Sequence, residues 1–239
     1  MSYDLLSERY DELVRFDYDG LFAAIKPSFP PSGAALDLCS GTGTFALKLS
    51  EAGFKVTCVD NSPKMLTEAA KKARAARRQL LFLQSDVNSL KIYGKYSLIT
   101  STCDGFNYVK SEENLKKLFG KIYDALTENG VLAFDVSTLY KAENVLSGQT
   151  FFEDTPTYTL FWTARKIEDG KIGTDVSVFK KEGDGYKRED GFFVQYFYRN
   201  ETYKRLLEQQ GFDVKFSDGE TYGDLNEKSN RLLVVARKK

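Results

Sequence analysis

The sequence of 239 residues contains no histidine. This absence excludes histidine triads, histidine general bases and histidine metal ligands together. The three cysteines, Cys39, Cys58 and Cys103, are scattered, without the paired spacing of a zinc site or a disulfide framework. We therefore expect reduced, buried thiols and no metal site. Proton transfer is left to carboxylates, tyrosines, water or the backbone.

The chain also lacks an excess of charge and a long hydrophobic run. Lysine and arginine number 34, as do aspartate and glutamate, so the net charge predicts neither nucleic acid nor an anionic membrane as a partner. The basic stretch 71–78 has alanines but no aromatic residues between its charges, which indicates a solvated helix face. No apolar run approaches the roughly 20 residues of a membrane helix, and the polar start does not resemble a signal peptide. We expect a cytoplasmic protein.

What is present is a regular alternation of strand-like and helix-like segments over residues 33–136. This alternation predicts a parallel sheet wrapped by helices, in the α/β class. Hydrophobic residues make up 42% of the chain, which is enough for a core. The expected strands are 34–38, 55–59, 80–84, 96–100 and 131–136, the last entered through a turn at Asn129-Gly130.

The pattern changes to a period of two after the fifth expected strand. Three antiparallel strands are expected at 158–164, 172–178 and 192–198, with glycine-containing turns near Gly170 and Gly183. The α/β alternation then resumes with a helix at 201–210 and strands at 212–216 and 231–237. We therefore expect residues 1–149 and 200–239 to form one α/β domain, and residues 150–199 to form an antiparallel β insertion that acts as a substrate lid.

A glycine-rich loop follows the first expected strand, in the segment Leu36-Asp37-Leu38-Cys39-Ser40-Gly41-Thr42-Gly43. Such a loop lets a ligand approach the backbone and the N–H groups of the next helix. Acidic residues end the first three strands: Asp37, Asp60 and Asp86. Ligands bind at the carboxyl edge of an open parallel sheet, so these acids and the loop predict a binding site there.

The order of acid, glycine-rich loop and second acid resembles that of the class I, Rossmann-like S-adenosylmethionine-dependent methyltransferases. The resemblance covers residues 33–136 at the level of motifs and implies S-adenosylmethionine as cofactor. It also implies a seven-stranded, mostly parallel sheet of order 3-2-1-4-5-7-6, with the last strand antiparallel. Cys39 departs from the pattern, because it stands where the family usually has its first glycine.

The resemblance also assigns the cofactor-binding residues one by one. Asp37, Gly41 and Gly43 would line the methionine end of the cofactor, and Asp60 would bind the ribose hydroxyls. Asn61 and Met65 would flank the adenine ring. Asp86 would accept from the adenine amino group, and Val87 would offer its backbone N–H. Cys103 would present its backbone carbonyl to the methionine ammonium.

The N-terminal run Tyr3-Asp4…Tyr10-Asp11 resembles the opening helix of small-molecule N-methyltransferases, in which a tyrosine-rich segment folds over the cofactor. It implies a small-molecule acceptor, methylated at nitrogen or oxygen. Tyr10 and Asp104 are the candidates for removing a proton, and the candidate acceptor-binding residues are Asn107, Tyr108, Tyr196 and Tyr198. Each has a structural alternative: Tyr10 as a packing residue, residues 104–108 as a helix cap, and the tyrosines of the insertion in a dimer interface. The protein is expected to be a monomer or a homodimer.

Two other functions stay open at this point. The segment from Gly41 to Ala46 loosely fits the fingerprint of a nicotinamide dehydrogenase. Asp37 argues against it, because a carboxylate there would face a pyrophosphate, whereas it suits a cofactor that carries ammonium and sulfonium charges. The second alternative is a non-catalytic, cofactor-binding or scaffolding relative.

Overall fold

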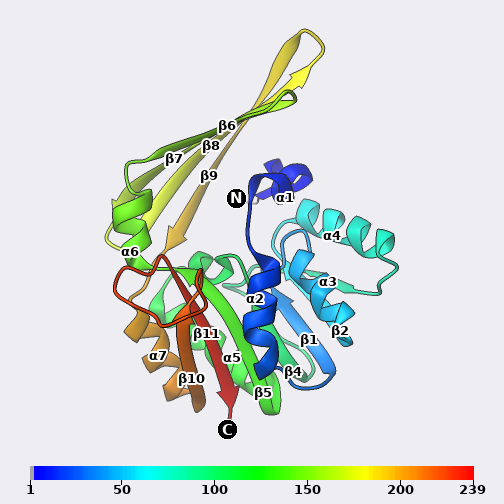
Figure 1. Ribbon diagram of the computed structural model, residues 1–239, viewed down its shortest axis with the longest axis vertical. Helices are drawn as coiled ribbons and strands as arrows, with labels where there is room; N and C mark the ends of the chain where they lie inside the picture. The colour runs from blue at the N-terminus through cyan, green and yellow to red at the C-terminus, as the bar shows by residue number, and fades with distance from the viewer. Residues whose placement is uncertain (1–2) are drawn as a thin grey trace.

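The computed structural model describes residues 3–239 and has two parts (Figure 1). A wound sheet with helices on both faces forms the lower part of the view, and a long twisted antiparallel sheet rises above it. In the described range, the wound sheet has seven strands in the order β10-β11-β5-β4-β1-β2-β3. Their bounds are β1 (Gly33–Leu38), β2 (Phe54–Asp60), β3 (Leu81–Gln84), β4 (Tyr96–Ser101), β5 (Leu126–Ser137), β10 (Phe212–Asp218) and β11 (Arg231–Lys238).

This topology confirms the predicted order. Strands β1 to β5 run parallel, whereas β11 is antiparallel to both of its neighbours, β5 and β10. The antiparallel direction has a consequence for the site: the first residue of β11, Arg231, lies opposite Ser137 at the end of β5. The carboxyl edge of the parallel strands therefore also holds the beginning of β11.

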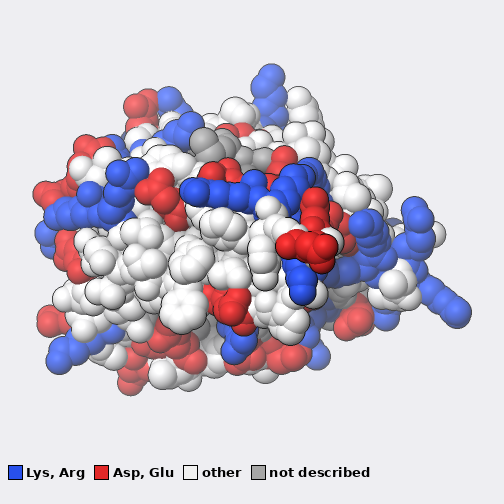
Figure 2. Space-filling view, turned by 90° about the horizontal axis from the view of Figure 1, so that it is seen from above, with Lys and Arg blue, Asp and Glu red and all other residues white. Residues whose placement is uncertain are grey.

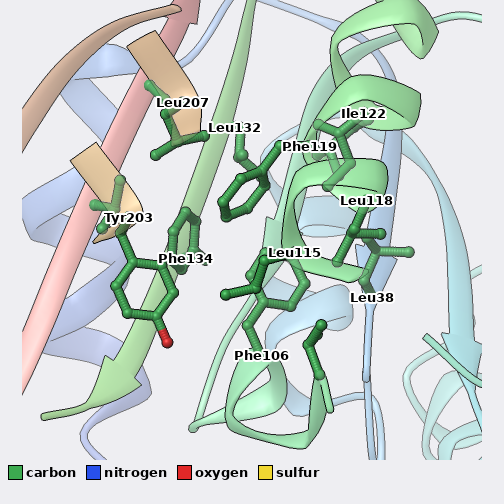
Figure 3. Close-up of a cluster of buried hydrophobic side chains, with 14 of the residues drawn as sticks. Leu38, Phe106, Leu115, Leu118, Phe119, Ile122, Leu132, Phe134, Tyr203 and Leu207 are labelled. Atoms are coloured by element: carbon green, nitrogen blue, oxygen red, sulfur yellow. The ribbon is translucent and has the colours of Figure 1, made fainter. Parts of the chain in front are cut away.

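Helices cover both faces of the sheet. One face packs against α2 (Tyr18–Ile25), α3 (Thr44–Glu51) and α4 (Pro63–Ala75), the other against α5 (Glu112–Ala125) and α7 (Asn200–Gln209). Ser62 caps α4 by accepting from the N–H of Met65 at 3.0 Å, and Pro63 occupies the first helical position. Figure 3 shows the core under α5, where Phe119 from the helix meets Phe134 from β5 and Phe106. Burial of each such side chain contributes about 1.5–3 kcal/mol to the stability of the folded protein.

The insertion has four strands in the order β6-β7-β8-β9, in the part of the chain that the structure describes. The predicted insertion is confirmed, but the sequence predicted three strands and missed β6, whose mostly exposed residues give no alternating pattern. Both predicted turns join neighbouring strands, because Glu168 pairs with Lys171 and Glu182 with Gly185. The bounds are β6 (Thr150–Asp154), β7 (Tyr158–Glu168), β8 (Lys171–Glu182) and β9 (Gly185–Tyr196), and β5 is joined to β6 through the short α6 (Leu139–Lys141).

The N-terminal segment lies between the two parts. It consists of two short turns, Tyr3–Leu5 and Ser7–Arg9, followed by α1 (Tyr10–Leu13). Leu6 is buried against the inner face of the insertion. On the other side, Asp4 Oδ1 accepts a 2.5 Å hydrogen bond from Ser62 Oγ, and Asp11 accepts one of 2.7 Å from Thr42. These contacts hold the segment across the carboxyl edge of the sheet.

Several element boundaries differ from the sequence-based expectation, most of all in β9, which spans Gly185–Tyr196 instead of residues 192–198. Strand β5 begins at Leu126 rather than at 131, because Asn129, with φ 59°, forms an irregularity inside the strand rather than a separate turn. Helix α5 is capped at its N-terminus by Ser111, which accepts from the N–H of Asn114. None of the helices within residues 3–239 is both long and apolar enough to cross a membrane. Figure 2 shows acidic and basic side chains interspersed around a broad area of other residues.

Candidate active site

A cavity of about 420 Å³ opens at the carboxyl edge of the wound sheet. This volume is in the range of small-molecule binding sites. Seven of the nine predicted cofactor-binding residues line it: Gly41, Asp60, Asn61, Met65, Asp86, Val87 and Cys103. The far wall comes from the N-terminal segment, the loop after β4 and strand β9, and its main members are Tyr3, Tyr10, Tyr108, Phe193 and Tyr196.

The glycine-rich loop between β1 and α3 adopts left-handed backbone conformations. Gly43, with φ 77°, packs closely on α4, since a Cβ there would lie 2.8 Å from the Cβ of Ala69. Cys39 has φ 54°, which few non-glycine residues adopt. The position holds a side chain nevertheless, and the Cys39 thiol contacts the carbonyl of Gly105 at 3.6 Å. Cys58 is buried as predicted, but Cys39 and Cys103 are only half-buried at the cavity.

Asp60 connects the loops that follow β1 and β2. Its two carboxylate oxygens each accept a 2.8 Å hydrogen bond, one from the N–H of Gly41 and the other from the N–H of Ser62. Burial raises the pKa of Asp60, and the hydrogen bonds to its charged form oppose this shift. The carboxylate thus fixes the glycine-rich loop and also lines the cavity.

Asp37 lies beneath the loop rather than in the lining of the cavity. Its side chain is buried, and Oδ1 accepts a 2.7 Å hydrogen bond from Thr100. Oδ2 is buried with no hydrogen-bond partner among the described residues, as are the hydroxyls of Ser40 and Ser101. Burial raises the pKa of Asp37 to about 7. A buried carboxylate with an unpaired oxygen suits a cationic ligand group, so this part of the site fits the ammonium of S-adenosylmethionine.

The loop after β4 contains two consecutive non-glycine residues with positive φ, Cys103 at 58° and Asp104 at 67°. Asp104 does not line the cavity in the described structure. Its carboxylate is ion-paired with Arg231 at 2.6 Å and accepts a hydrogen bond from Ser137 at 3.0 Å. Burial would raise the pKa of Asp104, but the charges of Arg231 and Lys141 and the hydrogen bonds lower it overall. The carboxylate is therefore ionised and engaged with Arg231.

Aromatic rings form the wall opposite the carboxylates. The ring of Tyr3 stacks on Phe193 with 4.3 Å between centroids and meets Tyr10 and Tyr108 edge-on. The hydroxyls of Tyr3 and Tyr108 are hydrogen-bonded to each other, and that of Tyr10 lies 3.7 Å from the sulfur of Cys103. Burial raises the pKa of Tyr10 well above its usual value, so this phenol stays protonated at neutral pH.

The structure brings Tyr108 and Tyr196 to the cavity but not Asn107 or Tyr198. The Asn107 amide donates to the carbonyls of Ser137 and Tyr196, at 3.1 Å each, and its oxygen accepts from the N–H of Ser137. The Tyr198 hydroxyl donates to the carbonyl of Val109 at 2.7 Å. Both residues therefore hold the 3₁₀ helix η4 (Gly105–Tyr108) and its C-cap against neighbouring elements. The structure adds Tyr3 and Phe193 to the cavity, two residues that were not named individually as site candidates.

The comparisons agree with this geometry. The family described as "methyltransferase domain" matches residues 35–130. A protein of Bacillus subtilis (strain 168) that is named as a methyltransferase, YqeM, is 30% identical over 246 residues, which cover 100% of this chain and 98% of that protein. A glycine/sarcosine N-methyltransferase of Aphanothece halophytica is 26% identical over 92% of this chain and 81% of its own length. The crystal structure of an S-adenosylmethionine-dependent methyltransferase from Clostridium acetobutylicum ATCC 824 superposes with a TM-score of 0.88 at 27% identity, covering 99% of this chain and 98% of that one.

Proposed function

Because the chain belongs to the S-adenosylmethionine-dependent methyltransferases, we propose that it methylates a nitrogen or oxygen atom of a small molecule. The observation that carries this proposal is the cavity with two unlike walls. One wall has the carboxylates and the glycine-rich loop expected for the cofactor, and the other is aromatic. The cavity lies under the N-terminal segment and β9, which leaves room for a small acceptor rather than a macromolecular one.

The cofactor half of the proposal keeps the residue roles inferred from the motif. Asp37 would face the methionine ammonium from below the loop, Gly41 would approach it from the loop, and Gly43 would hold the loop against α4. Asp60 would bind the ribose hydroxyls. The remaining roles concern the adenine ring and the loop after β4: Asn61 and Met65 would flank the ring, Asp86 and the N–H of Val87 would bind its edge, and the carbonyl of Cys103 would meet the ammonium.

The acceptor half rests on the insertion, residues 150–199, as a lid. Strand β9 contributes Phe193 and Tyr196 to the cavity, and Phe193 stacks against Tyr3 from the other end of the chain. Among the described lining residues Lys110 is the one cation, and it is exposed at the rim. This arrangement favours an acceptor that binds through apolar and aromatic contacts, with few ionic ones.

Bound S-adenosylmethionine supplies a methyl group on a sulfonium, whose sulfur is its own leaving group. The protein then needs to align the acceptor and exclude water, and most of the rate effect comes from these two contributions. The proposed role of Tyr10 is to orient the acceptor as a neutral hydrogen-bonding phenol, since its raised pKa leaves it a poor base at neutral pH. An amine acceptor that arrives uncharged releases its proton to water after transfer.

Two measurements test the proposed function. S-adenosylhomocysteine at 100 times its dissociation constant should stabilise the folded protein by about 2.7 kcal/mol, whereas NAD should not. Transfer of a labelled methyl group should then be measured on a panel of small amines, phenols, glycine and sarcosine, with a protein substrate and an RNA as controls. Stabilisation by NAD alone, or labelling of the macromolecules alone, would overturn the proposal.

A further inference from the structure

Arg231 is a buried cation that no sequence motif singled out. It begins β11 and has only 7% of its surface exposed. Because β11 runs antiparallel to β5, its first residue reaches the carboxyl edge of the sheet, next to the ends of β4 and β5. The guanidinium lies over the ring of Phe16, which closes this position from the N-terminal side.

The guanidinium of Arg231 holds two carboxylates, those of Asp104 and Asp135. Its two terminal nitrogens contact the two oxygens of Asp104 at 2.6 and 3.2 Å, and Nη1 is also ion-paired with Asp135. Asp135, which is fully buried, accepts the backbone N–H of Cys103 at 2.8 Å and that of Asp104 at 3.2 Å. One cation is therefore connected, through two carboxylates, to the loop after β4.

This loop needs to be held. A left-handed conformation at a non-glycine residue costs on the order of 1–3 kcal/mol and persists only where the surroundings impose it. Cys103 and Asp104 both have this conformation, and Asp135 binds both of their N–H groups. Without Arg231, the buried carboxylate of Asp135 and the half-buried one of Asp104 would lie close together, with only the charge of Lys141 near Asp104 to offset them, which is unfavourable. The loop would then lose the charge balance on which its conformation depends.

We propose that Arg231 is a positioning residue that fixes residues 103–104, so that Cys103 and Gly105 form the cavity wall at the methionine end of the cofactor. This inference rests on the proposed function for the identity of that end. Asp104 then has a structural role, because its ion pair with Arg231 helps to hold the loop on which it lies.

The test compares Arg231→Met with Arg231→Lys and with a matched control, Arg237→Met. Arg237 lies on the same strand, is exposed, and donates to carbonyls of Asn129 and Ser28 at the opposite edge of the sheet. Binding of S-adenosylhomocysteine is measured by calorimetry. Arg231→Met should weaken binding at least tenfold, Arg231→Lys should give an intermediate loss, and Arg237→Met should stay within threefold even if its melting temperature falls.

A second readout reports on the loop without any ligand. Cys103 lies on the loop, whereas Cys58 is buried in β2. Iodoacetamide labelling followed by peptide mass spectrometry should show faster modification of Cys103 in Arg231→Met, with Cys58 still protected. Faster modification of both thiols would indicate global unfolding and would count against a local positioning role.

Asp104→Asn provides the same test in a protein that keeps Arg231. Asp104→Asn should weaken S-adenosylhomocysteine binding and speed Cys103 labelling, as Arg231→Met does, but to a smaller extent. If both variants bind S-adenosylhomocysteine within threefold of the parent and keep Cys103 protected, Arg231 only stabilises the fold and the inference is overturned. Failure to methylate any acceptor would overturn the proposed function but leave the labelling result standing.

Discussion

The two walls of the cavity are built in different ways. The wall proposed to hold the cofactor, called the cofactor wall here, comes from residues 39–103, where the strands of the sheet end in acids or loops that face the same edge. The aromatic wall combines three groups, each about 90 residues from the next along the chain: Tyr3 with Tyr10, then Tyr108, then Phe193 with Tyr196. A cofactor site can therefore be a local feature of the sequence, whereas the acceptor site depends on long-range packing.

The two walls also differ in charge. Burial raises the pKa of Asp60 on the cofactor wall, where hydrogen bonds from backbone N–H groups oppose the shift, and raises that of Asp37, beneath the wall, to about 7. On the aromatic wall, burial raises the pKa of Tyr10 and Tyr108, which therefore stay neutral. Variants of the first wall should thus alter cofactor affinity and its pH dependence, and variants of the second should alter acceptor affinity alone.

Asp37→Asn should produce the largest effect. The folded-state pKa of Asp37, about 7, is above its unfolded value of 3.8, so the folded protein holds the proton more tightly. Protonation of Asp37 therefore contributes up to about 4 kcal/mol to the free energy of unfolding. This contribution is complete below about pH 4 and is lost as the pH rises through about 7. Asp37→Asn should therefore be more stable than the parent at pH 8 and lack this decline, as measured by urea unfolding at pH 5 and pH 8.

The same substitution should have the opposite effect on binding. In the proposed site, ionised Asp37 would attract the cofactor ammonium, so the parent should bind S-adenosylhomocysteine more tightly as pH rises from 5.5 to 8, and Asp37→Asn should not. At pH 8 we expect a loss of at least tenfold, about 1.4 kcal/mol. Asp213→Asn, at an exposed carboxylate of β10, is the control. If the parent protein binds S-adenosylhomocysteine with the same affinity from pH 5.5 to 8, Asp37 does not contact the cofactor ammonium.

Asp60→Ala should be next in size. It removes the proposed charge-assisted acceptor for the ribose hydroxyls, worth on the order of 1.5–3 kcal/mol per bond, so calorimetry should show a 10- to 100-fold loss of affinity for S-adenosylhomocysteine. The free protein should also lose about 1–3 kcal/mol, because the N–H groups of Gly41 and Ser62 lose their acceptor. If the variant is less stable but binds S-adenosylhomocysteine with unchanged affinity, Asp60 holds the glycine-rich loop and does not bind the cofactor.

The contrast between the walls also explains what the sequence could predict. Strand order, the insertion and the acids at the cavity follow from local patterns: alternation of strands and helices, a glycine-rich loop, and the rule that ligands bind at carboxyl ends. The rule did not predict Arg231, because this residue begins an antiparallel strand and therefore reaches the same edge from the opposite direction. A search for charged residues at the start of such strands would have found it.

Asp104 and the tyrosines show the other limit. Asp104 follows β4 as a site residue would, but its charge is matched by Arg231, 127 residues away. Tyr196 and Tyr198 have the same parity along the chain, yet β9 ends at Tyr196 and only that residue faces the cavity. Periodicity cannot report where a strand stops, because that depends on its partner. Here β8 provides the last pairing, Lys171 with Tyr196.

Tyr196→Ala and Tyr198→Phe form a matched pair for the lid. Tyr196→Ala should weaken acceptor binding roughly tenfold, seen as a raised KM, while S-adenosylhomocysteine affinity stays within threefold. Tyr198→Phe removes only the hydrogen bond to Val109, so it should cost about 1 kcal/mol of stability and leave acceptor KM unchanged. Sedimentation of both variants tests the alternative: dissociation of a dimer with normal acceptor KM would make this face an interface instead of a lid.

The smallest effect is expected at the hydrogen-bonded hydroxyls of Tyr3 and Tyr108. Tyr3→Phe keeps the stack on Phe193 and removes only the hydroxyl, so the pocket wall should keep its shape. A net hydrogen bond is worth about 0.5–1.5 kcal/mol, so acceptor KM should change about two- to tenfold, with cofactor binding unaltered. Tyr108→Phe should give a similar change, and the double variant should add little to either, because the two hydroxyls are expected to act on the acceptor as one pair. Strictly additive effects would mean that they contact the acceptor independently. A loss of cofactor affinity in Tyr3→Phe would extend the cofactor wall to the N-terminal segment and end the distinction between the two walls.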